Sequence, residues 1–246
     1  MKLNFSGRTA LITGGSGGIG LSIVKKLIKN KIKVIILDIN TPSKKILLNK
    51  YVEFIKTDLS DYKNLQLCLT ELKKKYKKIE YVINAAGVLW FDKDVSLEKI
   101  EINTWDKVFS INLNSIVIVL QNILPQMKKN KFGSIVHISS IDALSGDNKP
   151  QDAYGSSKGG VHGLSLVMTD KLSNHGIRVH DILPGSVDTP MKNSQIEKTR
   201  DITGNQVEYK NIKKMLVEPE GIAKIIYFIC SDEARLLKGS IRTEWK

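Results

Sequence analysis

Two side chains that could move a proton, Tyr154 and Lys158, stand four positions apart in the sequence. In a helix, residues with this spacing lie on one face, so the phenol and the ammonium group can converge. An unperturbed tyrosine titrates near pKa ~10, and a neighbouring cation favours its phenolate form. The pair therefore predicts a general acid and base. Tyr209 and Lys213 have the same spacing but lie in a polar segment, so we interpret them as a decoy.

A glycine-rich turn follows the first apolar run and leads into a helical pattern: Thr13-Gly14-Gly15-Ser16-Gly17-Gly18-Ile19-Gly20. Glycines let the backbone approach a pyrophosphate, and the helix N-terminus offers free N–H groups and a positive dipole end. The spacing differs from G-x-G-x-x-G, and the Gly-Lys-Ser/Thr of a Walker loop is missing. The segment predicts a phosphate-binding turn, with a merely tight turn as the alternative.

Asp38 ends the next apolar run, ~20 residues after the turn, where an acid can accept hydrogen bonds from both adenosine-ribose hydroxyls. A 2′-phosphate would meet like charge there, and neither Ser16 nor Ile39 supplies a cation. We therefore expect NAD as the cofactor, with NADP disfavoured. The alternative is a turn-capping aspartate before Asn40.

The elements that must position these side chains alternate between short apolar runs and longer helical patterns. Predicted strands are Arg8–Thr13, Lys33–Asp38, Val52–Lys56, Tyr81–Asn84, Ser134–Ser139 and Arg178–Leu183. Predicted helices are Ile19–Lys29, Tyr62–Tyr76, Thr104–Lys129, Tyr154–His175 and Pro219–Cys230. Strands this apolar, separated by helices, predict a parallel sheet covered on both faces. The crossover between residues 39 and 51 is so short that we expect only a stunted helix there.

Composition favours one globular domain over residues 1–246, since 41% of the residues are hydrophobic, 26% are charged, and no repeat or linker divides them. Cys68 and Cys230 are the only cysteines, which favours a reducing compartment and no metal site. Residues 1–7 lack the apolar core of a signal peptide, and the longest apolar run, Ile116–Leu120, is too short for a membrane span. We expect a cytoplasmic protein without a membrane partner.

The formal net charge of +13 raises the possibility of a nucleic-acid partner. The excess is nearly all lysine, in clusters near the ends of predicted helices, such as Lys25-Lys26, residues 73–78 and residues 128–131. Cations there complement the helix dipole. We interpret the clusters as solvated helix ends and expect no nucleic-acid partner.

The segment Met191–Val217 is polar, lacks clear periodicity and carries Gly204 between two possible short helices. An insertion after the carboxyl end of a strand in an open α/β sheet often covers the ligand. We expect a substrate lid within residues 191–218, with a disordered surface loop as the alternative.

Seven short motifs follow one another along the chain: the glycine-rich turn, Asp58-Leu59, Asn84-Ala85-Ala86-Gly87, Ile111-Asn112-Leu113, Ser139-Ser140, Tyr154-x3-Lys158 and Pro184-Gly185-Ser186-Val187-Asp188-Thr189-Pro190. Together they resemble the short-chain dehydrogenase/reductase family from about residue 5 to about residue 240. The resemblance implies an α/β fold of Rossmann type, with a doubly wound parallel sheet flanked by helices on both faces. It also implies an NAD(P)-dependent oxidoreductase that transfers a hydride between nicotinamide and an alcohol or carbonyl substrate.

The resemblance further implies a catalytic set. Tyr154 would be the general acid/base, and Lys158 would lower its pKa and hydrogen-bond the nicotinamide ribose. Ser140 would donate to the substrate oxygen, with Ser139 as its rival. Asn112 would hold a water that links Lys158 to solvent; the alternative is a buried asparagine satisfied by the backbone.

The implied cofactor contacts begin with the turn residues Gly14, Ser16, Gly18 and Ile19, followed by Asp38. Asp58 and Leu59 would flank the adenine, and Asn84 and Ala86 would line the adenosine ribose and the backbone track. The nicotinamide side would be formed by Pro184, Gly185, Val187 and Thr189, together with Tyr154 and Lys158. Two alternatives stay open: Asp58 as a cap before Ser60, and Asn84 as a stabiliser of the strand-end turn.

Three departures from the family pattern stand out. The stretch between Ser140 and Tyr154 is about one residue longer than usual and contains Lys149-Pro150. Asn84-Ala85-Ala86-Gly87 replaces the frequent Asn-Asn-Ala-Gly. The ending after Lys238 lacks the usual Asp-Gly-Gly.

The expected substrate pocket mixes aromatic, aliphatic and polar residues: Leu89, Trp90, Phe91, Asp142, Leu144, Gln151, Ser186 and Met191. It suits a polyol, sugar or hydroxy acid, and the alternative is a 3-oxoacyl thioester on an acidic carrier protein. A hypothesis of another class, a non-catalytic dinucleotide-binding module, is disfavoured because the catalytic set is complete.

We expect a homo-oligomer, either a dimer or a tetramer, joined through the two long helices. Their apolar residues exceed one sheet-facing stripe: Ile116, Val117, Val119, Leu120 and Ile123 in the first, and Val161, Leu164, Leu166 and Val167 in the second. The alternative is burial within one subunit.

Overall fold

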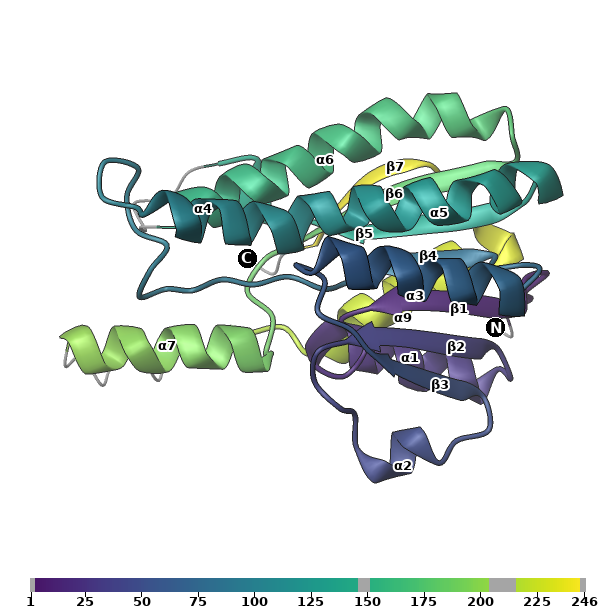
Figure 1. Ribbon diagram of the computed structural model, residues 1–246, viewed down its shortest axis with the longest axis horizontal. Coiled ribbons are helices and arrows are strands. Elements are labelled where there is room, and N and C mark those ends of the chain that lie inside the picture. The colour runs from purple at the N-terminus through teal and green to yellow at the C-terminus, as the bar shows by residue number, and fades with distance from the viewer. Residues whose placement is uncertain (1–2, 146–150, 204–215, 244–246) are drawn as a thin grey trace.

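The computed structural model describes residues 3–145, 151–203 and 216–243 and shows a single seven-stranded parallel sheet (Figure 1). The strand order is β3-β2-β1-β4-β5-β6-β7. The strands are β1 Thr9–Thr13, β2 Lys33–Asp38, β3 Val52–Lys56, β4 Tyr81–Asn84, β5 Gly133–Ile138, β6 Ile177–Pro184 and β7 Gly239–Thr243. The six predicted strands are confirmed within one residue at each end. The edge strand β7 was not among them.

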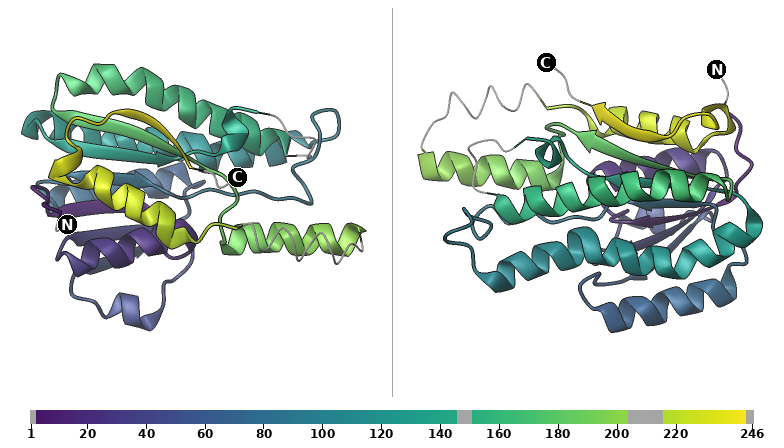
Figure 2. Two further views of the ribbon diagram at one scale, coloured as in Figure 1. Left: turned by 180° about the vertical axis from the view of Figure 1, so that it is seen from behind. Right: turned by 90° about the horizontal axis from the view of Figure 1, so that it is seen from above.

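Helices cover both faces of the sheet, as the doubly wound prediction requires. They are α1 Gly18–Lys29, α2 Lys44–Leu47, α3 Tyr62–Lys75, α4 Ile102–Phe109, α5 Ser115–Asn130, α6 Asp152–Ser173, α7 Pro190–Thr203 and α9 Pro219–Cys230. Helices α3, α5 and α6 pack on one face, and α1 and α9 lie together on the other (Figure 2). The helix α2 has only four residues, so the stunted crossover is confirmed.

The strands are apolar on both sides because each side meets a helical layer. In β1, Ala10 and Ile12 join the core beneath α1 and α9, while Leu11 joins the core beneath α3 and α5. Strand β2 alternates in the same way. A strand buried on both faces cannot show the apolar–polar alternation of a half-exposed sheet, which explains the continuous apolar runs in the sequence.

The predicted helix Thr104–Lys129 is divided into α4 and α5 by a π-helical turn, Ser110–Asn114. By length and composition alone, Ile102–Asn130 is apolar enough to cross a membrane. Its apolar residues Val119, Ile123 and Met127 are instead fully buried in the core against the sheet. The hydrophobicity of this segment is therefore that of a core helix.

The segment expected to contain a lid starts as a regular helix, α7, at the position of the first short helix expected before Gly204. The helix is polar, and its side chain Ile196 is buried. The segment returns to the sheet where Val217 forms a β-bridge with Val187. Residues 204–215, with Tyr209 and Lys213, and the lengthened loop at Lys149-Pro150 lie outside the described residues.

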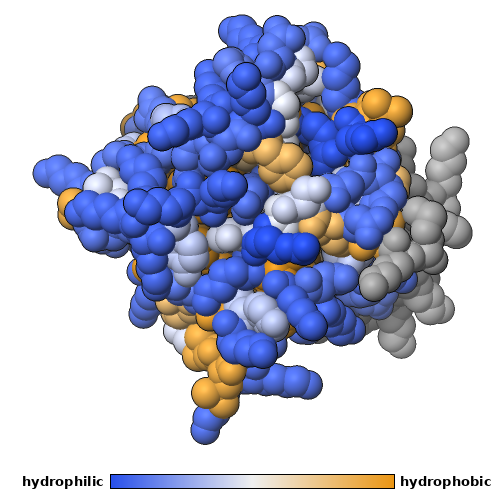
Figure 3. All heavy atoms as spheres, turned by 90° about the vertical axis from the view of Figure 1, so that its right-hand side faces the viewer, coloured by the Kyte–Doolittle hydropathy of each residue, from blue (hydrophilic) through white to orange (hydrophobic). Residues whose placement is uncertain are grey.

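The lysine clusters lie at helix ends, as expected. The last turns of α1, α3 and α5 carry Lys26 and Lys29, residues 73–75, and Lys128 with Lys129. These turns face the amino ends of the strands, and the surface seen from that side is largely hydrophilic with scattered apolar side chains (Figure 3). The carboxyl ends of the strands lie at the opposite edge, near α7 (Figure 1).

Candidate active site

A cavity of about 730 Å³ lies over the carboxyl ends of the strands. Its walls come from the turns that follow β1, β2, β3, β4, β5 and β6, and from α6 and α7. In an open parallel sheet this edge is where ligands bind, because successive turns diverge from it. The glycine-rich turn and the Tyr154–Lys158 pair both line this cavity, so they belong to one site.

The glycine-rich turn has room for no side chain at two positions. Gly14 has a φ of +71°, and a Cβ on it would lie 2.6 Å from the backbone nitrogen of Ala86. A Cβ on Gly20 would lie 2.1 Å from the carbonyl oxygen of Gly14. The turn therefore packs backbone against backbone and presents the N-terminus of α1, whose N-cap Gly17 has no side-chain cap, to the cavity.

Ser16 adds a polar group at this end of the cavity. Its backbone nitrogen donates to Asp38, while its buried hydroxyl oxygen has no hydrogen-bond partner among the described residues. An unpartnered hydroxyl beside free helix N–H groups is the arrangement that an anionic phosphate fits. Gly18, Ile19 and Ala86 line the same end of the cavity, as predicted.

Asp38 combines the two roles that the sequence left open. Its Oδ2 accepts from the nitrogen of Ser16 at 2.9 Å, and its Oδ1 accepts from the nitrogen of Asn40 at 2.9 Å. It also lines the cavity, next to the exposed Ile39. The carboxylate thus holds the turn in place and puts a negative charge where an adenosine ribose would lie.

Asp58 and Leu59 line the cavity beyond Asp38. The Oδ1 of Asp58 accepts from the backbone nitrogen and the hydroxyl of Ser60, at 2.8 and 2.7 Å. The capping alternative is therefore present in the structure together with the cavity position. Pro184, Gly185, Val187 and Thr189 also line the cavity, and Thr189 lies beside Gly18 of the glycine-rich turn.

Asn84 is not among the residues that line the cavity, and its contact with a cofactor stays a prediction. It is 1% exposed, and its Nδ2 lies 3.1 Å from Nδ1 of His137 on the neighbouring strand. The β4 side chain points into the layer behind the cavity, where it links β4 to β5. This position matches the alternative, a stabiliser of the strand end.

Tyr154 and Lys158 meet at the other end of the cavity, in the first two turns of α6. The Nζ of Lys158 lies 5.6 Å from the centroid of the Tyr154 ring and donates to the carbonyl oxygen of Ile138 at 2.7 Å. Burial lowers the pKa of Lys158 to about 8. The predicted convergence of the two side chains is present.

The pKa of Tyr154 is raised, whereas the sequence predicted that it would be lowered. Burial raises it, the charge of Asp142 raises it further, and the hydrogen bond from Ser140 acts in the opposite direction. The ammonium group of Lys158 binds the Ile138 carbonyl and does not offset these effects. Tyr154 therefore stands in the cavity as a protonated phenol, able to give a proton.

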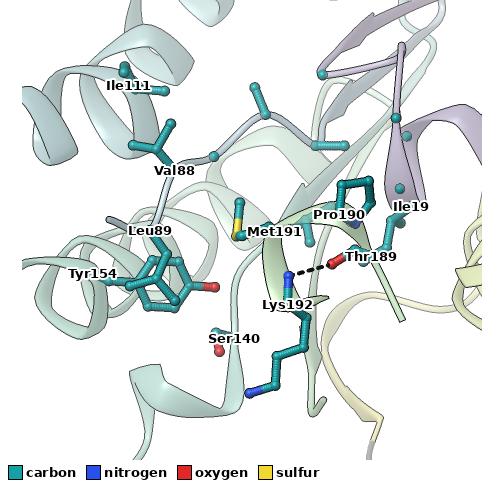
Figure 4. Close-up of a pocket in the computed structure, with 18 of the residues that line it drawn as sticks. Ile19, Val88, Leu89, Ile111, Ser140, Tyr154, Thr189, Pro190, Met191 and Lys192 are labelled. Atoms are coloured by element: carbon teal, nitrogen blue, oxygen red, sulfur yellow. Dashed lines mark hydrogen bonds between the residues drawn. The ribbon is translucent and has the colours of Figure 1, made fainter. Parts of the chain in front are cut away.

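The two serines after β5 differ in what their hydroxyls do. Ser139 is 2% exposed and donates to the carbonyl oxygen of Lys158 at 2.9 Å, so its hydroxyl is used by the backbone of α6. Ser140 donates to Oδ2 of Asp142 at 2.9 Å and lies beside Tyr154 (Figure 4). The geometry favours Ser140 as the group that meets a ligand.

Asn112 lies in the π-helical turn, is fully buried and does not line the cavity. Its Oδ1 accepts from the nitrogen of Val88 at 2.8 Å, and its Nδ2 donates to the carbonyl oxygen of Val88 and to Oγ of Ser157 at 3.1 and 3.0 Å. The side-chain amide is thus satisfied within the protein, as in the alternative, and a water held by Asn112 stays a prediction. The Asn112 side chain ties the loop after β4 to α6.

Asp94 was not singled out in the sequence, although it positions Tyr154. Its fully buried carboxylate accepts from the backbone nitrogens of Ala153 and Tyr154, at 2.9 and 2.8 Å. It thus caps α6, whose N-cap Gln151 makes no side-chain cap bond. Asp94 comes 59 positions before Ala153 and 60 positions before Tyr154 in the sequence, and no local sequence signal points to this interaction.

The substrate end of the cavity contains most of the expected residues: Leu89, Trp90, Asp142, Gln151, Ser186 and Met191. Phe91 and Leu144 do not line it, because each lies outside the turn that reaches the cavity. Lys192 and Gln195 of α7 also line it and were not among the predicted pocket residues. Figure 4 shows Met191 and Lys192 facing Tyr154 and Ser140.

Within the described residues, no group of three or more histidine, cysteine, aspartate or glutamate side chains is placed to hold a metal ion. The polar groups of the cavity are hydroxyls, amides, lysines and single carboxylates. They suit an organic ligand with phosphate and carbonyl groups.

A family model described as short chain dehydrogenase matches residues 8–200. A 3-oxoacyl-[acyl-carrier-protein] reductase from Thermotoga maritima is 29% identical over 245 residues, which cover 97% of this chain and 96% of that protein. A 3-hydroxyacyl-CoA dehydrogenase type-2 from Bos taurus is 29% identical over 257 residues, with coverages of 97% and 96%. The solved structure of ElxO with NADP bound matches with a TM-score of 0.82 at 24% identity, covering 96% of both chains.

The buried ring of His137 predicts a loss of stability in acid. Burial lowers its pKa from 6.5 to about 3, and the charge of Lys158 lowers it further in the same direction. Between pH 6.5 and about pH 3 the unfolded chain binds a proton at His137 that the folded chain does not bind. The free energy of unfolding is therefore unaffected by His137 above pH 6.5 and decreases as the pH drops toward 3. By about pH 4 the loss amounts to roughly 3 kcal/mol.

We expect His137→Asn, which keeps an acceptor for Asn84 but cannot gain the proton, to lose less stability than the wild type between about pH 7 and about pH 4. Urea unfolding followed by circular dichroism measures this difference. His175→Asn, at a partly exposed position after α6, is the control and should follow the wild type. A difference between the wild type and His137→Asn that does not change with pH would contradict the prediction.

Proposed function

This chain belongs to the short-chain dehydrogenase family, and we propose that Tyr154, Ser140 and Lys158 are its catalytic residues. It is an NAD(P)-dependent oxidoreductase that acts on a hydroxyl or carbonyl group. The observation that supports the residue assignment is the convergence of the Tyr154 phenol, the Ser140 hydroxyl and the Lys158 ammonium group at one end of the cavity.

The cofactor end fits a dinucleotide. The glycine-rich turn packs too closely for side chains, the N-terminus of α1 faces the cavity, and the Ser16 hydroxyl has no partner within the described residues. A bound nicotinamide supplies or accepts the hydride. In this proposal, the pyrophosphate is held by Gly14, Gly18 and Ser16. The adenosine ribose is held by Asp38.

Tyr154 then supplies the proton. Its pKa is raised by burial and by Asp142, so at neutral pH the phenol can donate to the oxygen of a carbonyl substrate. Ser140, turned from Asp142 toward the same oxygen, donates a second hydrogen bond and stabilises the developing negative charge. Lys158, with its pKa of about 8, remains mostly charged at neutral pH and favours the tyrosinate that results.

The preferred cofactor in this proposal is NAD. The carboxylate of Asp38 repels a 2′-phosphate, and neither Ser16 nor Ile39 provides a cation for it. NADP is the alternative, since the fold accepts it in ElxO.

For the substrate, we propose a compound whose reacting oxygen is on carbon 3 of an acyl chain. The names of the two curated relatives, a 3-oxoacyl reductase and a 3-hydroxyacyl dehydrogenase, both place it there. Such a compound can be a free hydroxy acid or a thioester. A polyol or a sugar is a further candidate substrate. The helix α7 would serve as the substrate lid, since its Met191 and Lys192 line the cavity opposite Tyr154.

Association of two or more copies through α5 and α6 is also part of the proposal. Ile116, Val119, Leu120, Ile123 and Val161 are buried within the subunit and cannot contribute, as the alternative supposed. Val117, Leu166 and Val167 remain 38%, 54% and 56% exposed, and they offer apolar surface to a second copy. The free cysteines Cys68 and Cys230 support a cytoplasmic location.

Tyr154→Phe tests the proton donor. The variant keeps the ring but has no hydroxyl, so kcat should fall by the ~10²–10⁴-fold that general acid–base catalysis supplies, while cofactor affinity changes little. Nicotinamide absorbance with a panel of alcohols and carbonyls, and titration of the cofactor, measure the two quantities. Tyr209→Phe, from the second pair with the same spacing, should be nearly silent; an equal loss there would show that the wrong pair was chosen.

Asp38→Asn tests the cofactor preference. The substitution keeps the shape and one acceptor oxygen for the turn but removes the charge, so KM for NAD should rise about tenfold and discrimination against NADP should relax. The ratio of kcat/KM for NAD to that for NADP is the measurement. Asp58→Asn removes another cavity carboxylate and should leave this ratio unchanged. A wild type that uses NADP more efficiently than NAD would refute the preference.

Val167→Lys tests the assembly. A charge in the middle of an apolar contact loses its hydration without gaining a partner, so the variant should dissociate to monomers at micromolar concentration. Static light scattering gives the mass. Leu67→Lys, which places the same charge at a leucine of α3 that is 67% exposed, is the matched control and should keep the wild-type mass. A monomeric wild type would overturn the proposal.

A further inference from the structure

We propose that Asp142 selects substrates that carry a hydrogen-bond donor, a hydroxyl or an ammonium group, on the carbon next to the reacting carbon. In the acyl compounds of the proposed function the reacting carbon is carbon 3, so the donor is on carbon 2. The inference rests on the proposed function and makes it more specific, because it adds a second group that the substrate carries.

Asp142 has one carboxylate oxygen that the protein does not use. The residue belongs to a 3₁₀ turn, Ile141–Ala143, whose N-cap is Ser140. The backbone nitrogen of Asp142 donates to Oγ of Ser140 at 3.2 Å, and this hydroxyl donates back to Oδ2 at 2.9 Å. Within the described residues, Oδ1 accepts no hydrogen bond. Capping of the turn therefore occupies only one of the two oxygens.

The negative charge of Asp142 is not neutralised by a cation of the described chain. The residue is partly buried and lines the cavity, as do Lys107, Lys158 and Lys192. None of these lysines forms an ion pair with Asp142. Its charge acts on the substrate end of the cavity, where it raises the pKa of Tyr154. Such a carboxylate is complemented by a ligand group that donates, and more strongly by one that is also positively charged.

Binding of the substrate oxygen makes the second carboxylate oxygen available as well. The hydroxyl of Ser140 has one proton and can donate it to one acceptor at a time. In the proposed reaction Ser140 donates to the substrate oxygen, so Oδ2 of Asp142 loses the donor that it has in this structure. A partly buried carboxylate that loses a donor costs free energy. A donor on the substrate replaces the lost one and removes this cost.

The position of the donor on the substrate follows from the position of Ser140. Its Oγ lies 2.9 Å from Oδ2 of Asp142, and in the proposed complex it is also within hydrogen-bond distance of the reacting oxygen. The carboxylate and the reacting oxygen are thus neighbours of the same hydroxyl. A donor on the adjacent carbon is separated from the reacting oxygen by only two carbon atoms, so it reaches Asp142 while the oxygen stays at Ser140 and Tyr154.

The donor group takes no part in the chemical step. Carbon 3 exchanges a hydride, with its two electrons, with the nicotinamide, and the oxygen on carbon 3 exchanges a proton with Tyr154. No bond to carbon 2 or to its donor forms or breaks. The contact with Asp142 is therefore present before and during the reaction, and its effect is expected mainly in KM.

Three acids that differ only at carbon 2 test the proposal: 3-hydroxybutanoate, 2,3-dihydroxybutanoate and 2-amino-3-hydroxybutanoate, each in all its stereoisomers. The full-length protein is assayed with NAD through nicotinamide absorbance. All three carry the same carboxylate, so its repulsion by Asp142 cancels when they are compared. The best isomers of the two compounds with a donor should have a kcat/KM about tenfold or more above that of 3-hydroxybutanoate.

Asp142→Asn tests the residue. The variant keeps the shape and an acceptor oxygen for Ser140 but removes the charge, so the preference for the ammonium compound should fall about tenfold and that for the dihydroxy compound by less. A change in the ionisation of Tyr154 affects all three acids alike and leaves their ratios unchanged. Asp142→Glu, which keeps the charge, should keep most of the preference for the ammonium compound.

Asp170→Asn is the matched control. It removes a carboxylate of α6 that is 84% exposed and pairs with Lys238 at 2.8 Å, outside the cavity. The three ratios should stay at the wild-type values. Melting temperatures of all variants show that each is folded.

The N-acetylcysteamine thioester of 3-oxobutanoate, assayed with NADH, separates this inference from the proposed function. If the thioester is reduced and the three acids are oxidised equally well or not at all, the inference is overturned while the reaction class stands. A preference that Asp142→Asn retains also overturns it, because the donor is then recognised elsewhere. If neither the thioester nor any acid reacts, the inference and the proposed substrate class both fall.

Discussion

The position of Tyr154 depends on one buried carboxylate, that of Asp94. Helix α6 begins at the edge of the cavity with unsatisfied backbone N–H groups, and its N-cap side chain does not cap them. Asp94 accepts from two of these groups and places its negative charge at the positive end of the helix dipole. Burial raises the pKa of Asp94, which shows that the charge is taken out of water to make these bonds. The first turn of α6, which carries Tyr154, is fixed in this way.

The remaining charges of the site are balanced around that turn. Lys158 is held by the Ile138 carbonyl at the end of β5, and Asp142 is held by Ser140 on the following turn. Burial and the Asp142 carboxylate raise the pKa of Tyr154 and favour the phenol, whereas the hydrogen bond with Ser140 acts in the opposite direction. A small movement of Ser140 from Asp142 to a ligand would change both the hydrogen bond to the ligand and the field at Tyr154. In the proposed reaction, one hydroxyl would thus couple proton donation by Tyr154 to binding of the substrate oxygen.

Local features of the sequence were sufficient for six of the seven described strands and for the glycine-rich turn. Apolar runs such as Lys33–Asp38 are strands because both faces of the sheet are covered, and Gly14 and Gly20 are required by direct backbone contacts. The interactions that could not be predicted are long-range. The carboxylate of Asp94 meets α6 across 59 positions, and the Asn112 amide meets Val88 across 24. Nothing in the residues near either one indicates its partner.

The two ends of the cavity are formed by different kinds of elements, strand-end turns at one end and a peripheral helix at the other. This difference explains how one fold can serve several substrates. The cofactor end consists of turns fixed by strands β1, β2 and β4, which lie in the middle of the core. The other end includes α7, a polar helix whose contacts with the rest of the described residues include the Lys198–Asp92 ion pair and the bond from Gln195 to Gln151. Substitutions on α7 can change the groups that face the substrate without disturbing the sheet. Relatives with differently named substrates can therefore share the core of this chain while differing at α7.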